Sequence, residues 1–206
     1  MSGCWLRSAN GRSRRALDMI VYLHGFNSSP QSSKAQHFKR HLEERGMGDR
    51  FVCPQLPHWP NEAIAAVETE MARRPRERMT LVGSSLGGFY ATWLAEKHKV
   101  CAALINPAID PHIGLRTFLG PQQNDHGGEK YELTEEHLRQ WERLFVPKVH
   151  PERYLLLVET GDEVLDYRVA VRRYLGAKQV VVQGGDHTLM SFSEQIPLIL
   201  GFAGIA

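Results

Sequence analysis

Five consecutive residues, Gly83-Ser84-Ser85-Leu86-Gly87, constrain the fold of this chain more than any other segment. They follow a short apolar run, Met79–Val82, that is typical of a buried strand, and they precede a helical pattern over Gly88–Lys97. A chain that changes from strand to helix within this length must turn very tightly, and glycine tolerates the close backbone approach because it has no Cβ. Such a turn would lift the Ser85 hydroxyl above the edge of a sheet. The pattern Gly-x-Ser-x-Gly in this setting predicts an exposed, nucleophilic serine.

The rest of the chain alternates apolar runs with helical patterns, which favours an α/β fold with a parallel sheet. We expect one helix at Ser33–Arg45 and a second that starts directly after Asn61, which would be its N-cap. A third is expected at Ile196–Phe202, with Pro197 in its first turn. The prediction is a compact α/β-hydrolase fold, with a mostly parallel sheet of about six strands and helices on both faces. The expected strands are Met19–Leu23, Phe51–Cys53, Met79–Val82, Val100–Ile105, Tyr154–Val158 and Gln179–Val182.

One segment, at about 111–149, breaks this alternation. It holds a polar, glycine-rich loop, Gln122–Lys130, and then a helix start at Thr134 with acidic residues in the first turn. We interpret the segment as a small helical cap inserted between two strands; an ordinary crossover helix with a long loop is the alternative. Residues 1–18 precede the strong patterning and are expected to be a flexible extension, so that 19–206 form a single domain.

Ser85 needs a base, and the base needs an orienting acid. In an α/β-hydrolase these follow the serine in the order acid, then histidine. Asp162 follows the end of the predicted strand at 154–158 and a glycine, and His187 follows the next predicted strand. Because the carboxyl ends of parallel strands meet at one edge of a sheet, the three side chains should lie together. Asp162 is therefore the predicted acid and His187 the predicted base.

Several neighbours compete for these roles. Asp166, Glu159 and Glu163 are the other candidate acids, and Ser84 and Ser28 are the other candidate hydroxyls. Asp186 is interpreted as a turn residue.

Two backbone N–H groups should stabilise the oxyanion. One follows the nucleophile and belongs to Leu86. The other should come from the loop after the first strand, where His24-Gly25 would turn the chain so that the N–H of Phe26 points at the substrate. The Phe26 side chain would then line an acyl pocket, and His24 would hold the loop.

Charge, cysteine content and hydropathy argue against several other classes of protein. The chain has 206 residues, and its net charge of +2 is too small to imply a nucleic-acid or membrane partner. Its arginine clusters are interpreted as a flexible leader and a solvated loop. The three cysteines form no CxxC or zinc spacing, and we expect no metal and no cofactor. No apolar run approaches the roughly 20 residues of a membrane span, and the N-terminus lacks the apolar region of a secretory signal. The default expectation is a cytoplasmic protein.

Six motifs can be compared with known families: 22–30 (YLHGFNSSP), 54–57 (PQLP), 82–94 (VGSSLGGFYATWL), 106–108 (NPA), 160–167 (TGDEVLDY) and the Gly-Gly-Asp-His of 184–187. In these motifs the chain resembles the YqiA-like bacterial esterases. The resemblance runs from Met19 to the C-terminus, and it weakens over residues 120–149. It implies a compact α/β-hydrolase with carboxylesterase activity, and acyl-CoA thioester hydrolysis as a further activity. By position it assigns the nucleophile to Ser85, the acid to Asp162 and the base to His187.

These observations predict a serine hydrolase of the carboxylesterase or thioesterase type. It would act on a small-molecule ester or acyl thioester through an acyl-enzyme on Ser85. An acyltransferase with the same triad is one alternative. A hydrolase fold that binds a ligand without catalysis is another, and an intact triad disfavours it.

Overall fold

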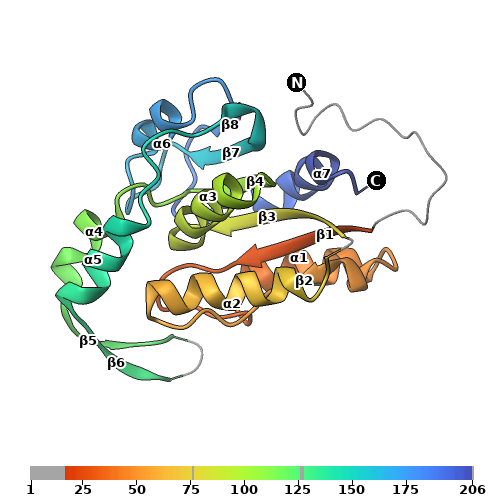
Figure 1. Ribbon diagram of the computed structural model, residues 1–206. Coiled ribbons are helices and arrows are strands. Elements are labelled where there is room, and N and C mark those ends of the chain that lie inside the picture. The colour runs from red at the N-terminus through yellow and green to blue at the C-terminus, as the bar shows by residue number, and fades with distance from the viewer. Residues whose placement is uncertain (1–16, 76, 126–127, 206) are drawn as a thin grey trace.

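The computed structural model describes residues 17–75, 77–125 and 128–205. In this part of the chain the main sheet has six strands in the order β2-β1-β3-β4-β7-β8, and every neighbouring pair is parallel (Figure 1). The predicted six-stranded parallel sheet is thus confirmed. The strands are β1 (Asp18–Leu23), β2 (Phe51–Val52), β3 (Arg78–Ser84), β4 (Cys101–Ile105), β7 (Tyr154–Glu159) and β8 (Lys178–Val182).

Helices cover both faces of the sheet, as predicted (Figure 1). On one face of the sheet, α1 (Ser33–Glu43) and α7 (Phe192–Ala203) pack against the buried side chains that β1 and β4 direct to that face. On the other face lie α2 (Pro60–Ala72), α3 (Leu86–His98) and α6 (Tyr167–Arg173). Strands β1, β4 and β7 are buried along their whole length and apolar except for Asp18 at the start of β1 and Glu159 at the end of β7, because helices cover the sheet from both sides.

The segment between β4 and β7 forms a group of short elements at one end of the sheet (Figure 1). The prediction of a polar loop over Gln122–Lys130 is wrong at both of its ends, because Gln123 pairs with Lys130 in an antiparallel hairpin. The predicted helix start at Thr134 is confirmed as the N-cap of α5. The elements of this segment are α4 (Pro111–Gly114), the 3-10 turn η2 (Leu115–Phe118), β5 (Gly120–Gln123), β6 (Lys130–Leu133), α5 (Glu135–Arg143) and the 3-10 turn η3 (Pro151–Arg153), which directly precedes β7. A further 3-10 turn, η1 (Gly48–Arg50), directly precedes β2.

Two expected helix starts are wrong. Helix α2 begins at Pro60, whose fixed φ suits a first turn, so Asn61 lies inside the helix and its N–H donates to Gln140 Oε1 at 3.1 Å. Helix α7 begins at Phe192, so Pro197 lies inside the helix and not in its first turn. Pro197 is solvent-exposed there, and it removes one backbone N–H from the helix ladder.

The predicted N-terminal extension lies outside the described residues, except for Leu17 and Asp18 at its end. Asp18 is already the first residue of β1. Within the described residues, no helix combines the length and the apolar character that crossing a membrane requires.

Candidate active site

Ser85 occupies the turn between β3 and α3 with φ +54° and ψ −120°, a backbone conformation that few L-residues adopt. Two glycines make this turn sterically feasible. A Cβ on Gly83 would lie 2.3 Å from the carbonyl oxygen of Gly87, and a Cβ on Gly87 would lie 2.1 Å from that of Leu23. Both distances are far below van der Waals contact, so the sequence folds here only with glycine at these positions. The tight strand-to-helix turn expected from the sequence is present.

Ser85, His187 and Asp162 lie in one hydrogen-bonded row. His187 Nε2 is 3.0 Å from Ser85 Oγ, and His187 Nδ1 is 2.9 Å from Asp162 Oδ2 and 3.0 Å from Oδ1. A carboxylate can only accept, so Nδ1 carries the proton and Nε2 is the acceptor for the Ser85 hydroxyl. The His187 side chain is 20% exposed and that of Asp162 only 1%, so the acid end of the row is shielded while the serine end is accessible.

The Asp162 carboxylate is held by backbone as well as by His187. Its Oδ1 accepts the N–H groups of Val164 at 2.9 Å and Leu165 at 2.8 Å. Burial by itself would raise the pKa of this carboxyl, but the hydrogen bonds from His187 and the backbone together lower the pKa below its ordinary value. Asp162 is therefore ionised at neutral pH, which is the state that can hold a histidine N–H.

The rival acids lie in other environments. Asp166 is the N-cap of α6 and accepts the N–H of Arg168 at 2.9 Å. Glu163 accepts the backbone N–H of His187 at 3.0 Å. Neither contacts the imidazole in the hydrogen bonds of the described residues.

Glu159 fixes the loop that carries His187. This residue ends β7 and is 1% exposed, and its carboxylate accepts the N–H groups of Asp186 and Met190 at 2.9 Å and Ser191 at 2.8 Å. Burial would raise the pKa of the carboxyl, but these hydrogen bonds, led by Ser191, lower it. The carboxylate thus holds the backbone on both sides of His187. Sequence reasoning treated Glu159 only as a rival acid; a charged residue that ends an apolar strand was the available signal.

Asn106 supports the same loop and was missed by the sequence reasoning. It follows β4 with φ +39°, and its Nδ2 donates to the carbonyl oxygens of Asp186 and His187, both at 3.1 Å. Its Oδ1 accepts the N–H of Glu159 at 3.1 Å. The signal in the sequence was an Asn directly after a strand, since Asn tolerates a positive φ.

The loop after β1 packs directly against Ser85. A Cβ on Gly25 would lie 3.3 Å from Ser85 Cβ. The His24 ring accepts the N–H of Leu56 at Nε2 (3.1 Å), so its Nδ1 donates to the carbonyl oxygen of Gly25 at 3.1 Å. His24 therefore ties the loop to the chain after β2, the structural role expected from the sequence. In the part of the chain that the structure describes, the N–H groups of Phe26 and Leu86 donate no hydrogen bond.

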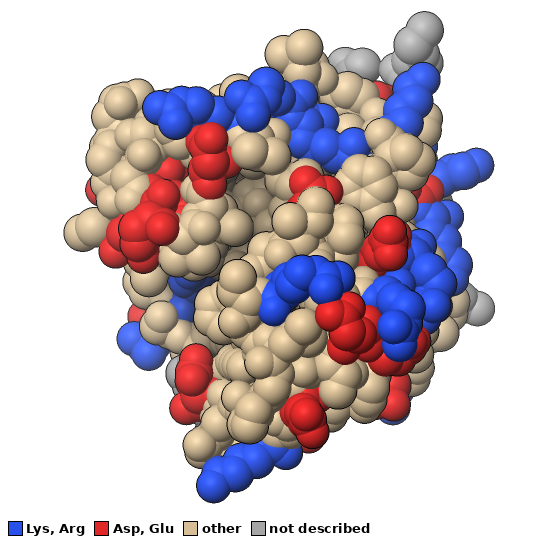
Figure 2. Space-filling view, turned by 90° about the vertical axis from the view of Figure 1, so that its left-hand side faces the viewer, with Lys and Arg blue, Asp and Glu red and all other residues tan. Residues whose placement is uncertain are grey.

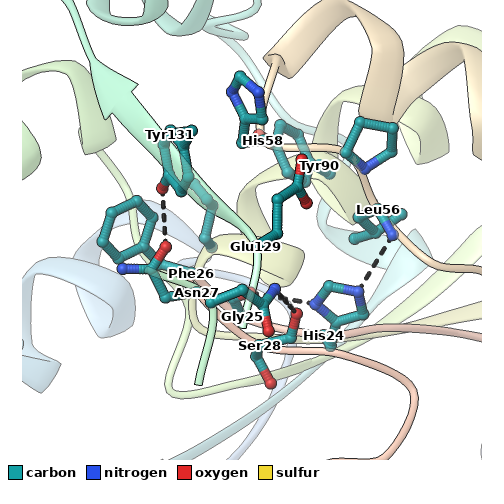
Figure 3. Close-up of a pocket in the computed structure, with 13 residues that line it drawn as sticks. His24, Gly25, Phe26, Asn27, Ser28, Leu56, His58, Tyr90, Glu129 and Tyr131 are labelled. Atoms are coloured by element: carbon teal, nitrogen blue, oxygen red, sulfur yellow. Dashed lines mark hydrogen bonds between the residues drawn. The ribbon is translucent and has the colours of Figure 1, made fainter. Parts of the chain in front are cut away.

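A pocket of about 420 Å³, its open mouth included, adjoins this loop (Figure 3). Phe26 and Leu86 lie in its wall beside Ser85, and the far wall comes from the β5–β6 hairpin and the segment after β2. Phe26 also packs edge-on against Phe118, with ring centroids 6.2 Å apart. The face that carries α4, α5 and the hairpin is hollowed, and positive and negative side chains alternate over it without forming a continuous basic surface (Figure 2).

Metal ligands do not gather at this site. Within residues 17–75, 77–125 and 128–205, no three His, Cys, Asp or Glu side chains are placed to hold a metal ion.

A family model and several solved structures match the chain. The model of an uncharacterised protein family, UPF0227, matches residues 19–204. Among solved structures, a protein from Agrobacterium vitis S4 is 17% identical with a TM-score of 0.73, and the match covers 92% of this chain and 91% of that one. The solved structures named in this subsection are all below 20% identity, so they bear on the fold alone.

Two further solved structures match more than 90% of this chain. Est1E from Butyrivibrio proteoclasticus is 15% identical with a TM-score of 0.71, over 92% of this chain and 89% of that one. A monoacylglycerol lipase from Paleococcus ferrophilus is 15% identical with a TM-score of 0.64, over 93% and 96%. Together with an α/β-hydrolase domain protein from mouse, at TM-score 0.67, they establish the α/β-hydrolase fold predicted from the sequence.

Proposed function

The chain belongs to the uncharacterised protein family UPF0227, the YqiA-like family that its motifs resemble, and on this premise we propose that it is a serine esterase. The single observation that carries the proposal is the row of hydrogen bonds from Ser85 Oγ through His187 to Asp162, at 3.0 and 2.9 Å. Hydrogen-bond contact between nucleophile, base and orienting acid is the geometry that activates a serine hydroxyl. The substrate is a carboxylic ester of a small molecule or of an acyl chain.

In the proposed reaction Ser85 Oγ attacks the ester carbonyl while His187 Nε2 takes the hydroxyl proton. Asp162, ionised and buried, keeps the imidazole in the required tautomer and stabilises its cation. His187 then gives the proton to the departing alkoxide, which leaves an acyl group on Ser85. A water molecule, deprotonated by the same nitrogen, attacks the acyl carbon; the bond from that carbon to Ser85 Oγ then breaks, His187 returns the proton to Oγ, and the carboxylic acid leaves.

The tetrahedral oxyanion would bind the N–H groups of Phe26 and Leu86. Two observations support this pair: both residues line the pocket beside Ser85, and neither N–H is used in a hydrogen bond among the described residues. Leu86 is the first residue of α3, so its N–H points out of the helix end, where partial positive charge favours an anion. Preorganised donors of this kind contribute about 10²–10³ each to kcat.

A fluorophosphonate probe tests the proposal, since it labels only an activated serine. Wild type should be labelled and should hydrolyse a p-nitrophenyl ester. Ser85→Ala should lose the label and about 10⁶-fold in kcat, because it removes the bond-forming atom. Ser84→Ala is the matched control: Ser84 is buried and adjacent in sequence but outside the hydrogen-bonded row, so labelling should persist.

Two outcomes contradict the proposal. If folded wild type takes no label and cleaves no ester, the protein is not a serine esterase, and a ligand-binding role is indicated. If Ser85→Ala is labelled as well as wild type, another hydroxyl is the nucleophile. Product analysis with and without added alcohol or amine separates hydrolysis from acyl transfer.

A further inference from the structure

The pocket beside Ser85 has an unusual charge pattern. Among its described lining residues there is one carboxylate, Glu129, and no Lys or Arg. The Glu129 side chain enters from the hairpin and points into the middle of the pocket, toward Tyr90 and His58 (Figure 3). A substrate group that occupies this space would therefore meet a negative charge.

The Glu129 carboxylate has no counter-ion in the described part of the chain. No ion pair and no hydrogen bond to its side chain is found there. The flanking strand explains why. Glu129 directly precedes β6, and side chains alternate along an extended strand, so that Tyr131 lines the pocket as Glu129 does, whereas Lys130 and Glu132 do not. Glu129, Lys130 and Glu132 are all solvent-exposed. The adjacent lysine is thus directed away from the carboxylate.

Aromatic rings form much of the surrounding wall. The His58 ring stacks on the Tyr131 ring at 4.3 Å between centroids, and Phe26 and Tyr90 also line the pocket. Burial, and after it the negative charge of Glu129, raise the pKa of the Tyr131 phenol, in keeping with the short distance between the two side chains in the pocket wall. Aromatic faces attract cations through the ring quadrupole, and a carboxylate attracts them by charge.

We propose that this pocket binds a cationic group, an ammonium or quaternary ammonium, on one half of the ester substrate, and that Glu129 determines this specificity. The inference rests on the proposed esterase function, because it assigns the substrate of the same site. The cation would lie between the Glu129 carboxylate and the aromatic rings, with the ester carbonyl at Ser85. An anionic substituent in the same place would face an uncompensated like charge and be disfavoured.

Isosteric ester pairs test the proposal. In one pair the charge is on the alcohol half: choline butyrate against neohexyl butyrate, in which carbon replaces nitrogen. In the other pair it is on the acyl half: the p-nitrophenyl ester of a trimethylammonio-butyrate against its tert-butyl isostere. In wild type, kcat/KM for the cationic member of at least one pair should exceed that of its neutral isostere by about 10-fold.

Glu129→Gln should bring that ratio close to unity, since it removes the charge and keeps the size. Glu132→Gln removes the same charge three residues further along the chain, in β6, from a side chain that does not line the pocket, and it should leave the ratio at the wild-type value. Two results would overturn the proposal: a ratio near unity in both wild-type pairs, or a cationic preference that Glu129→Gln retains.

Choline binding, measured by calorimetry, separates this proposal from the esterase proposal. If wild type hydrolyses neither member of any pair, the esterase proposal fails, while the pocket proposal still predicts choline binding to wild type and Glu132→Gln and about 10-fold weaker binding to Glu129→Gln. If all three proteins bind choline equally or not at all, the cation site is rejected whatever the catalytic result.

Discussion

At the scale of single residues, the backbone of Ser85 is the most demanding feature of the molecule. A non-glycine residue at φ +54° costs about 1–3 kcal/mol, and it persists only where the surroundings determine it. Here the N–H of Ser85 donates to the carbonyl oxygen of Ile105 at 3.0 Å, and its own carbonyl oxygen accepts from Gly88 and Ala108. The neighbouring strand and the first turn of α3 therefore hold Ser85 in the geometry that exposes its hydroxyl.

Asp162→Asn should lower kcat by about 10⁴-fold with little change in KM. The amide has the size of the carboxylate, but it can offer its NH₂ to His187 Nδ1, which would favour the tautomer with the proton on Nε2. That tautomer cannot accept the Ser85 proton. Steady-state kinetics on a p-nitrophenyl ester measure the loss, and thermal unfolding shows whether the fold is retained.

Asp166→Ala is the control for that variant, because Asp166 was a rival acid and lies four residues away. It caps α6 through the N–H of Arg168, so the variant should lose about 1 kcal/mol of stability and keep its activity. A loss of activity comparable with that of Asp162→Asn would show that the acid has been assigned to the wrong residue.

At the scale of elements, the β5–β6 hairpin holds the loop that carries Phe26. Most of its hydrogen bonds to this loop involve Asn27, which has φ +49°, and one more runs from Asn124 Nδ2 to the Ser28 carbonyl oxygen at 2.8 Å. The Tyr131 hydroxyl donates to Asn27 Oδ1 at 2.7 Å, Asn27 Nδ2 donates to Gln122 Oε1 at 3.0 Å, and the N–H of Asp125 donates to the Asn27 carbonyl oxygen at 2.9 Å. Since Asn27 follows Phe26 directly, the hairpin sets the direction of a proposed oxyanion donor.

Tyr131→Phe should therefore lower kcat for a neutral ester by about 3- to 30-fold, a part of the loss of about 10²–10³ expected when such a donor is removed outright. KM should change little, because the ring and its stacking on His58 remain. Tyr167→Phe, the same change on α6, should leave both constants unaltered. A rise in KM without a fall in kcat would show that the hairpin acts on substrate binding alone.

The elements differ in how well the sequence predicts them, and the reason is the range of the interactions involved. Strands β1, β3, β4 and β7 are apolar runs whose pattern is local, so their positions were predicted to within about two residues. The hairpin depends on Tyr131 and Asn27, which are 104 residues apart in the sequence. No local pattern in a polar, glycine-rich segment signals that contact.

The residues of the candidate site also differ in how well the sequence predicts them, and for the same reason. The proximity of Ser85, Asp162 and His187 follows from strand order, because each residue comes after a strand of one parallel sheet. Their catalytic roles stay a prediction until the variants are assayed. The function of Glu159 depends on how the chain after β8 folds back over β7, and this path is set by tertiary packing rather than by residues near Glu159.

At the scale of the whole molecule, the segment between β4 and β7 is joined to the sheet and its helices through α5 (Figure 1). Trp141 Nε1 donates to the Tyr90 hydroxyl at 2.8 Å, and His137 and His58 are joined at 3.0 Å between Nε2 and Nδ1. His137 Nδ1 accepts the N–H of Thr134 at 3.1 Å, so Nε2 carries the proton and donates to His58. The contact therefore requires that His137 is neutral and that His58 Nδ1 is unprotonated.

The His137 side chain is fully buried, and burial, followed by the charge of His58, lowers its pKa to about 4. The unfolded chain, with an ordinary pKa near 6.5, binds this proton more tightly than the folded chain does. Stability should therefore fall as the pH drops from about 6.5 to about 4, by on the order of 1–3 kcal/mol from this group. The other groups around the ring are His58, Glu136 with its partners Arg139 and Arg143, and the aromatic side chains of Trp59, Tyr131 and Trp141.

His137→Gln isolates this contribution, because a Gln three residues after an N-cap Thr preserves the capping interaction of α5 and does not titrate. Urea unfolding of wild type and variant at intervals between pH 7 and pH 4 gives the comparison. Both should lose stability as carboxylates are protonated, but wild type should lose on the order of 1–3 kcal/mol more. Parallel stability curves would mean that His137 binds its proton equally well in the folded and unfolded chain, and that acid does not weaken the attachment of α5 through this pair.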